Sequence, residues 1–296
     1  MSTVLITGSS GFLGKHMVKY LTYEHIFTSS RTNSDINTDL TLEAPLIPNV
    51  DVVVHCASKA HSVPKTEKEK RAFFDVNING TLNLLKGLEN SAFPVSFIFI
   101  SSVAVYGLEK GTLITEDAPP LATDPYGKSK TEAEKIIQDW CTKNNVICTI
   151  LRLPLIAGSS PPGNLKSMIN GIKKGYYFNV GGGKARKSIV LAADIAKIIP
   201  VVAGIGGTYN LTDQYHPNFS ELSTMIAQQL GKSKPLNIPL WIATLMAKIG
   251  DLAGSNAPLN SNKLKKITSD LTFDDSKAQK LLGWKPKQVL KDFKIQ

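Results

Sequence analysis

Cysteine is scarce in this chain, with three residues in 296 and no Cys-x-x-Cys pair among Cys56, Cys141 and Cys148. An odd count at wide spacing argues against a disulfide framework and against a zinc site, and it fits a reducing cytoplasm. The five histidines show no ligand spacing either. We therefore expect no metal and no disulfide scaffold.

Long apolar runs are also missing, because no stretch reaches the ~18 uninterrupted apolar residues of a membrane span. The first eight residues contain neither a basic region nor a small-residue cleavage site, so we expect a first strand rather than a signal peptide. The lysines are dispersed, without interleaved aromatic residues, which argues against a nucleic-acid module. We expect a cytoplasmic protein without stable membrane insertion.

Positive charge is in excess, at a formal net charge of +10. A basic balance favours anionic partners, and a dinucleotide or a diphosphate substrate would both benefit. A solvated basic surface without a specific partner explains the same number equally well.

Short apolar runs alternate with amphipathic segments as far as residue 150, which is typical of a parallel sheet covered by helices on both faces. The expected strands are Val4–Thr7, His25–Ser30, Asp51–His55, Val95–Ser101 and Val146–Leu151. The expected helices are Phe12–Tyr20, Thr66–Asn90 and Asp124–Asn144. The prediction for residues 1–158 is therefore a doubly wound α/β domain of the Rossmann type.

After Gly158 the pattern changes to loops and separate helices, with loops at 159–163 and 181–183. Helical spacing recurs at Ala192–Val202, Ser220–Leu230 and Leu240–Leu252. Residues 159–296 are interpreted as a smaller, mostly helical substrate-binding region, with some segments returning to the sheet.

The segment Ile238–Ala253 is strongly apolar and contains Trp241, with Lys248 as its single basic residue. A membrane-surface helix usually carries several basic residues. Burial, a lid or a subunit contact is therefore favoured over a membrane-surface helix.

A glycine-rich motif, Thr7-Gly8-Ser-Ser-Gly11-Phe-Leu-Gly14, lies between the first strand and the first helix. Glycines allow a sharp turn and a close approach of the backbone to a pyrophosphate, which the helix N-terminus then stabilises. Three glycines at this spacing are weak evidence alone, but their place at the first strand–helix junction favours dinucleotide binding.

Two further patterns supply candidate chemistry. Tyr126 and Lys130 lie four residues apart on an expected helix, where a protonated lysine would lower the pKa of the phenol and make it a usable acid/base. Ser101 and Ser102 end an apolar run, at the edge where parallel sheets bind ligands. Each pattern is common in isolation, and together with the glycine motif they become specific.

The combination resembles the extended short-chain dehydrogenases/reductases, in the epimerase/dehydratase group that acts on nucleotide sugars. Further similar segments are His55-Cys-Ala-Ser58, Asn77-Ile-Asn-Gly80-Thr81, Leu151-Arg152-Leu-Pro154, Asp194 in its Leu-Ala-Ala-Asp-Ile-Ala context, and Asp275 to Trp284. The resemblance runs from residue 1 to about residue 290. It implies a nicotinamide-dependent enzyme.

The resemblance also implies roles for individual residues. Ser102, Tyr126 and Lys130 would be the catalytic set, with Tyr126 as acid/base, Lys130 on the nicotinamide ribose and Ser102 on the reacting oxygen. The cofactor would further contact Gly8, Gly11, Phe12, Leu13, Gly14, Arg31, Asp35, Ile36, Ala57, Ser58, Asn77 and Pro154. The substrate would contact Ser102, Val103, Asn164 and Arg186. A guanidinium also suits phosphate on chemical grounds, although Arg186 could equally be a surface residue.

Two local features bear on the reaction. Sugar 4,6-dehydratases of this family carry Asp-Glu directly after the catalytic Ser or Thr, whereas this chain has Val103 and Ala104, which cannot transfer protons. The second expected strand ends without an acidic residue, and Arg31 follows it. An arginine there can meet a 2′-phosphate, which favours NADP(H) slightly over NAD(H).

Other differences from the ordinary galactose epimerases are Leu155 in place of an asparagine and the absence of a C-terminal Arg-x-Gly-Asp motif. The main hypothesis is hydride transfer at C4 of a nucleotide-linked hexose, as reduction of a 4-keto sugar nucleotide for surface-polysaccharide synthesis. The alternatives are a UDP-sugar 4-epimerase with tightly bound NAD, and a catalytically silent dinucleotide-binding subunit. The resemblance implies a homodimer.

Overall fold

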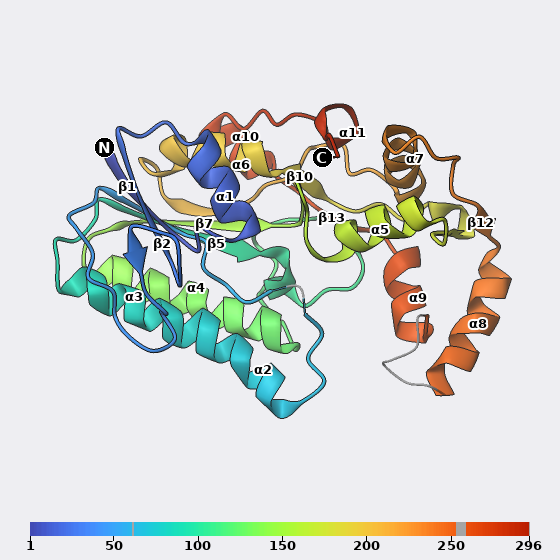
Figure 1. Cartoon of the computed structure of the whole chain (residues 1–296), viewed down its shortest axis with the longest axis horizontal. Helices are drawn as coiled ribbons and strands as arrows, with labels where there is room; N and C mark the ends of the chain where they lie inside the picture. Colours follow the sequence, from blue (N-terminus) through green and yellow to red (C-terminus); the bar gives the residue numbers. More distant parts are fainter. Residues whose placement is uncertain (61, 253–258, 296) are drawn as a thin grey trace.

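The centre of the molecule is a parallel sheet of seven strands in the order β11-β7-β5-β4-β1-β2-β3 (Figure 1). The computed structural model describes all residues except 61, 253–258 and 296. The strands are β1 Thr3–Thr7, β2 His25–Ser30, β3 Ile36–Asn37, β4 Val52–His55, β5 Ser96–Ser102, β7 Ile147–Leu153 and β11 Gly207–Asn210. The chain winds outward in both directions from β1 and β4, so the predicted doubly wound fold class is confirmed.

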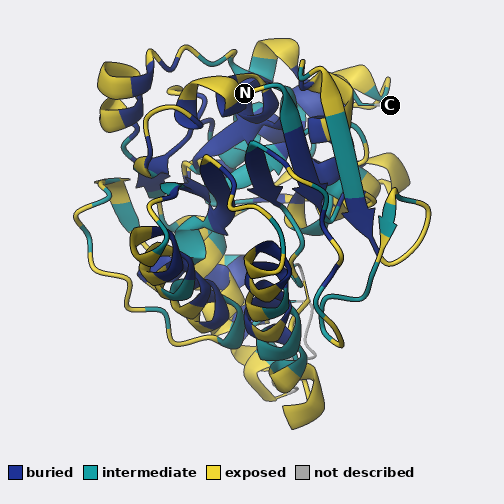
Figure 2. Cartoon of the chain, turned by 90° about the vertical axis from the view of Figure 1, so that its left-hand side faces the viewer, coloured by how far each residue is buried: buried dark blue, intermediate teal, exposed yellow. Residues whose placement is uncertain are grey.

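Helices cover both faces of this sheet. Helices α1 (Phe12–Tyr20), α6 (Ala192–Val202) and α10 (Ser276–Leu282) lie on one face, and α3 (Gly80–Glu89) and α4 (Pro125–Lys143) lie on the other (Figure 1). Strand residues alternate between the two cores, as the period of two requires. The sheet is consequently buried, whereas the outer faces of the helices are exposed (Figure 2).

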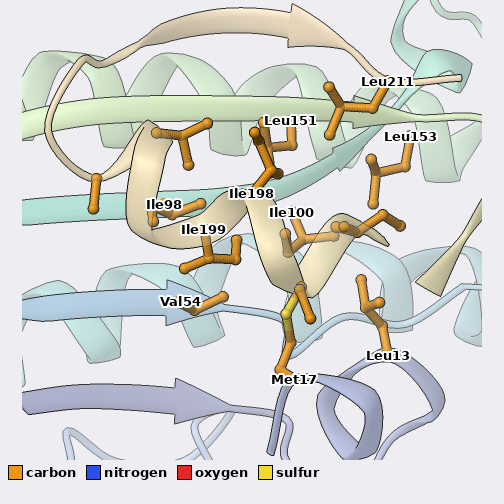
Figure 3. Close-up of a cluster of buried hydrophobic side chains, with 14 of the residues drawn as sticks. Leu13, Met17, Val54, Ile98, Ile100, Leu151, Leu153, Ile198, Ile199 and Leu211 are labelled. Carbon is orange, nitrogen blue, oxygen red and sulfur yellow. The ribbon is translucent and has the colours of Figure 1, made fainter. Parts of the chain in front are cut away.

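The core between α6 and the sheet is built from the strand side chains that point to this face. Ile198 and Ile199 of α6 meet Ile98 of β5 and Leu151 of β7, and Met17 of α1 packs beside Val54 (Figure 3). Complete burial of such side chains stabilises the fold by roughly 1.5–3 kcal/mol each. This packing holds the carboxyl ends of the strands in a fixed arrangement.

The predicted helix Thr66–Asn90 is divided in the structure. It consists of α2 (Glu67–Phe74), a π-helical segment η1 (Asp75–Asn79), and α3. Thr66 caps the first part, where its hydroxyl accepts a hydrogen bond from Glu69 N at 3.2 Å. Isolated π turns inside helices are rare and occur mostly near functional sites.

The C-terminal region is built from short elements beside the sheet. They are β8 Leu155–Ala157, α5 Gly163–Lys174, β9 Asn179–Val180, η3 Gly181–Gly183, β10 Ile189–Leu191, α7 Phe219–Gln229, β12 Asn237–Ile238, α8 Leu240–Leu252, α9 Ser261–Thr268, β13 Leu271–Phe273 and α11 Val289–Asp292. The 3-10 turn η2 (Val103–Tyr106) and β6 (Gly111–Ile114) complete the elements, and β6 pairs with β13. β11 and α6 belong to the main sheet and its core, so the boundary at residue 158 stays a proposal.

Helix α8 does not bury its large apolar side chains within the chain, which rules out the first of the three favoured interpretations of the segment 238–253 and leaves the lid and the subunit contact untested. Trp241 is 71% exposed, and the buried residues of the helix are Ala243 and Ala247. Ala253 lies outside the described residues. In the described part of the chain, no helix has the length and apolar character needed to cross a membrane.

Candidate active site

The candidate residues gather at the carboxyl edge of the sheet. In a parallel sheet all strands end at the same edge, and ligands bind in the crevice where the strand order reverses. Here β1 ends at the glycine motif, β4 at Cys56 to Ser58, β5 at Ser102, and β7 at Pro154. Residues far apart in the sequence are thereby brought to one edge.

The glycine motif forms a turn that leaves no room for side chains. A Cβ on Gly8 would lie 2.7 Å from Ala57 Cα, and Gly8 has φ +65°. A Cβ on Gly14 would lie 2.2 Å from the Gly8 carbonyl oxygen. Gly11 begins α1 without a side-chain cap, so the first N–H groups of that helix are free of side-chain acceptors. The cradle therefore fits a dinucleotide pyrophosphate.

Phe12 and Leu13 lie on the first turn of α1 directly after this cradle. Leu13 is buried in the core and Phe12 packs against it, so both side chains hold the helix to the sheet. Their backbone N–H groups are the atoms that the cradle can offer to a phosphate.

Helix α4 places Tyr126 at its start, beside the end of β5. Asp124 accepts a hydrogen bond from Gly127 N at 3.0 Å, and Pro125 occupies the first turn. The Ser102 side chain lies close enough to Tyr126 to act on the pKa of its phenol. The candidate acid and the candidate oxyanion donor thus adjoin.

The pKa of Tyr126 is raised, mainly because the phenol is desolvated, and the charge of Asp124 raises it further. The Ser102 side chain acts in the opposite direction and is outweighed. This corrects the expectation that Lys130 lowers the pKa of Tyr126. The Lys130 ammonium instead donates to the Ile100 carbonyl at 2.7 Å.

Lys130 is 2% exposed, and its burial lowers the pKa of the ammonium to about 7. The negative charge of Glu134 opposes this shift. The ammonium also lies 4.2 Å from the centroid of the Phe99 ring. Such a group loses its proton near neutrality unless a ligand supplies further acceptors.

Asn77 lies in the π-helical segment and is 1% exposed. Its amide nitrogen donates to Ser129 Oγ at 2.8 Å, and its amide oxygen accepts from Lys59 N at 2.7 Å. Ser129 in turn donates to the Tyr126 carbonyl at 2.8 Å. Asn77 therefore connects the loop after β4 with the helix of Tyr126 and Lys130.

A buried ion pair behind the site was missed by the sequence analysis. Arg152 Nη2 and Glu134 Oε2 are 2.7 Å apart, with side chains 8% and 5% exposed. Glu134 also accepts from Ser101 Oγ, and Arg152 donates to the Tyr106 hydroxyl at 3.1 Å. The available signal was spacing, because Glu134 follows Lys130 by one helical turn.

Asp35 and Ile36, the residues expected to contact the adenine, lie at the start of β3 rather than after it. Asp35 accepts a hydrogen bond from Thr28 N at 2.8 Å. The acidic–aliphatic pair that follows β3 at the carboxyl edge is Asp39-Leu40. A sequence pattern alone could not choose between the two pairs, because β3 has only two residues.

Arg31 follows β2 directly and is exposed. The pKa of Asp39 is lowered mainly by hydrogen bonds from Thr41, and the positive charge of Arg31 adds to this effect. The guanidinium is therefore placed at the end of the second strand, where the ribose of a bound dinucleotide is expected to lie.

The other expected contacts are distributed around the edge. Ala57 and Pro154 are half-buried after β4 and β7, and Ser58 is exposed beside Ala57. Val103 packs into the small apolar cluster of Val105, Tyr106 and Phe273. Within the described residues, no group of three or more His, Cys, Asp or Glu side chains could hold a metal, and the three cysteines are free.

The two expected substrate residues lie on separate elements of the C-terminal region. Asn164 is exposed on the first turn of α5, whose N-terminus has no side-chain cap. Arg186 is exposed before β10, where its guanidinium donates to the His216 carbonyl at 3.0 Å and lies 5.9 Å from the Tyr215 ring centroid. Neither of these two partners, a backbone carbonyl and an aromatic ring, carries a negative charge.

Comparisons with known proteins agree with this geometry. The chain is 30% identical to a UDP-glucose 4-epimerase from Vibrio cholerae, over 98% of this chain and 92% of that protein. It is 33% identical to a GDP-6-deoxy-D-mannose reductase from Pseudomonas aeruginosa, over 46% of each chain. The solved UDP-glucose 4-epimerase of Thermotoga maritima shares the fold with a TM-score of 0.75 at 19% identity, covering 98% of this chain and 95% of that one.

The family profile described as "NAD dependent epimerase/dehydratase family" matches residues 4–211, which is more than half of the chain. The matched region contains the glycine cradle, Ser102, Tyr126 and Lys130. The chain belongs to the NAD-dependent epimerase/dehydratase family and is an enzyme of the extended short-chain dehydrogenase/reductase type.

Proposed function

We propose that this enzyme transfers hydride at C4 of a nucleotide-linked hexose, by reducing a 4-keto sugar nucleotide with NADPH. The observation that carries the proposal is the placement of Ser102, at the end of β5, beside Tyr126, which lies at the start of the same helix that holds Lys130. Val103 and Ala104 follow Ser102, so the carboxylates of a 4,6-dehydratase are absent from that position.

Tyr126 would be the proton donor in the reductive direction. When bound, the reduced nicotinamide supplies a hydride to the carbonyl carbon. The electron pair of the C=O bond then moves onto oxygen, and Tyr126 donates its phenolic proton to that oxygen. Tyr126 carries this proton at neutral pH, as any phenol with a pKa at or above its ordinary value does. Ser102 stabilises the developing alkoxide with a hydrogen bond.

Other residues hold the ligands. The cradle of Gly8, Gly11 and Gly14 would bind the pyrophosphate of the cofactor, and Lys130 would turn from the Ile100 carbonyl towards the ribose hydroxyls. Arg31 would meet a 2′-phosphate, which supports NADPH over NADH. Asn164 and Arg186 would bind the diphosphate of the substrate.

The alternative within the same chemistry is a 4-epimerase with tightly held NAD. The 30% identity with the Vibrio cholerae UDP-glucose 4-epimerase, over nearly the whole of both chains, favours it. An epimerase would remove hydride from C4 and return it to the opposite face, with Tyr126 accepting and then donating the proton. The intact Ser102, Tyr126 and Lys130 set argues against a silent subunit.

The deciding experiment is to identify the dinucleotide released when the pure protein is denatured, and to titrate the emptied protein with NADH and NADPH. Preference for NADPH, followed by turnover of a 4-keto sugar nucleotide, is the expected result. Arg31→Ser should then weaken NADPH binding and leave NADH binding unchanged. Stoichiometric NAD that survives purification would identify the epimerase instead.

Tyr126→Phe tests the catalytic assignment under both hypotheses. The variant lacks the proton donor but keeps the ring, so turnover should fall by roughly 10²–10⁴-fold with cofactor binding retained. Full activity of Tyr126→Phe would refute the role of this residue.

A further inference from the structure

Helix α8 is oriented with its small residues inward and its large apolar residues outward. Ala243 and Ala247 pack against Leu264 and Ile267 of α9. The outward side carries large apolar residues at intervals of four, four and three residues, which places them on one face of the helix. They are Trp241 (71% exposed), Leu245 (56%), Ile249 (62%) and Leu252 (91%).

Further exposed apolar residues lie near the start of α8. β9 pairs with β12, and Asn179 N donates to the Leu236 carbonyl at 2.9 Å, so the residues before these strands lie near the start of α8. Three of those residues are also exposed and apolar: Tyr176, Phe178 and Leu236. We call these three residues and the four on α8 the α8 surface. It lies at the opposite end of the molecule from the N-terminus (Figure 1).

Positive charge accompanies this apolar surface. Lysine pairs precede both strands, Lys173 and Lys174 before β9 and Lys232 and Lys234 before β12, and Lys248 lies on α8. All five are exposed. The segments 163–180 and 222–250 contain no Asp or Glu. The five lysines therefore outnumber Asp251, which is the one acidic residue of α8.

The whole excess of positive charge lies in the C-terminal part of the sequence. Residues 159–296 contain 19 Lys and Arg against 8 Asp and Glu, whereas residues 1–158 contain 15 against 16. The formal charge is thus +11 in the C-terminal region and −1 in the N-terminal region. Part of this excess lies on α10, which covers the main sheet, and the five lysines named above place another part beside the α8 surface, where it would attract an anionic surface.

We propose that the α8 surface docks the enzyme onto an anionic lipid bilayer, with α8 lying in the plane of the headgroups. Trp, Phe and Tyr side chains suit the boundary between headgroups and acyl chains, and lysines extend from it to phosphate groups. A second copy of the chain fits less well. In a two-fold contact the same surfaces meet, so lysine pairs would face lysine pairs, and protein interfaces are depleted of lysine.

The chain supplies its own reporter for this docking. Of the three tryptophans, Trp140 is 8% and Trp284 is 4% exposed, so Trp241 dominates any change in emission that lipid causes. The experiment mixes the full chain with vesicles of equal parts phosphatidylcholine and phosphatidylglycerol, or of phosphatidylcholine alone. Binding is measured by sedimentation, and burial of Trp241 by its blue shift and by quenching with brominated lipid.

The variant Leu245→Ser/Ile249→Ser removes two outward side chains while keeping Trp241. Because both residues are exposed, the fold should be unaffected, and partition onto anionic vesicles should fall about tenfold or more. The matched control is Leu42→Ser/Leu46→Ser, which removes two exposed leucines far from α8 in the sequence (80% and 89%) and should bind as before. Lys232→Glu/Lys234→Glu should weaken binding and reduce its dependence on salt.

Three outcomes would overturn the proposal. They are an absence of binding to anionic vesicles, equal binding of Leu245→Ser/Ile249→Ser and the unaltered protein, and loss of self-association rather than vesicle binding in that variant. The last would make the α8 surface a contact between copies. The assay requires no turnover, so its result is independent of the proposed reaction.

Discussion

The buried ion pair of Glu134 and Arg152 yields a quantitative prediction. Glu134→Gln removes the negative charge but keeps the shape, leaving a guanidinium that is 8% exposed without its counter-ion. Removing one partner of a buried pair costs about 3–5 kcal/mol of unfolding free energy. Ser101 also loses a charged acceptor. We therefore expect the loss to lie within that range, measured by urea denaturation with linear extrapolation.

The chain offers a matched control in Lys70 and Glu67. Their charged atoms are 2.6 Å apart, almost the same as in the buried pair, but the side chains are 45% and 88% exposed. Because solvent screens this pair, Glu67→Gln should cost no more than about 0.5 kcal/mol. Replacing both buried partners, as Glu134→Leu/Arg152→Met, should recover part of the loss. If Glu134→Gln and Glu67→Gln cost the same, burial is not what gives the pair its importance.

Three further predictions follow from the site. Gly14→Ala should abolish dinucleotide binding, because its Cβ would lie 2.2 Å from a carbonyl oxygen, whereas Gly204→Ala, with 3.8 Å to the nearest atom, should bind normally in the same titration. Lys130 loses its proton at about pH 7 when folded and at ~10.4 when unfolded, so the unfolded state holds more protons between these values. The free energy of unfolding of the cofactor-free protein should therefore rise by up to about 5 kcal/mol relative to that of Lys130→Met as pH rises through that window. Curves of unfolding free energy against pH that stay parallel for the two proteins would contradict this. Asn77→Ala should cost about 1–3 kcal/mol by leaving Lys59 N–H without its acceptor, and a kcat that does not fall would show that Asn77 does not position α4.

The sequence predicted the central sheet well because its signals are local. Helices Phe12–Tyr20, Ala192–Val202 and Leu240–Leu252 have the expected bounds, and the five predicted strands differ by two residues at most, whereas β3 and β11 were not predicted. Strands buried on both faces show as short apolar runs, and glycine marks the first turn. Helix α5 was missed even though Leu165, Met168, Ile169 and Ile172 recur at helical spacing.

The contacts of the site were less accessible to sequence analysis. That Lys130 bonds to the Ile100 carbonyl, and that burial controls the pKa of Tyr126, depends on packing between α4 and β5. Which of Asp35 and Asp39 follows the strand at the carboxyl edge depends on where the two-residue strand β3 ends. The exposure of Trp241 depends on which face α9 covers, and an apolar helix has several candidates for that face.

Strand β11 is translated long after its partner β7, and this delay affects how the chain folds during translation. β11, at residues 207–210, pairs with β7, at 147–153, and Trp284 closes the same core as Val4. While the protein emerges from the ribosome, β7 remains an unpaired edge for some sixty residues of further translation, at about 5–20 residues per second. An edge exposed for several seconds is a template for wrong pairing, and the hazard ends only when β11 has been synthesised and pairs with β7.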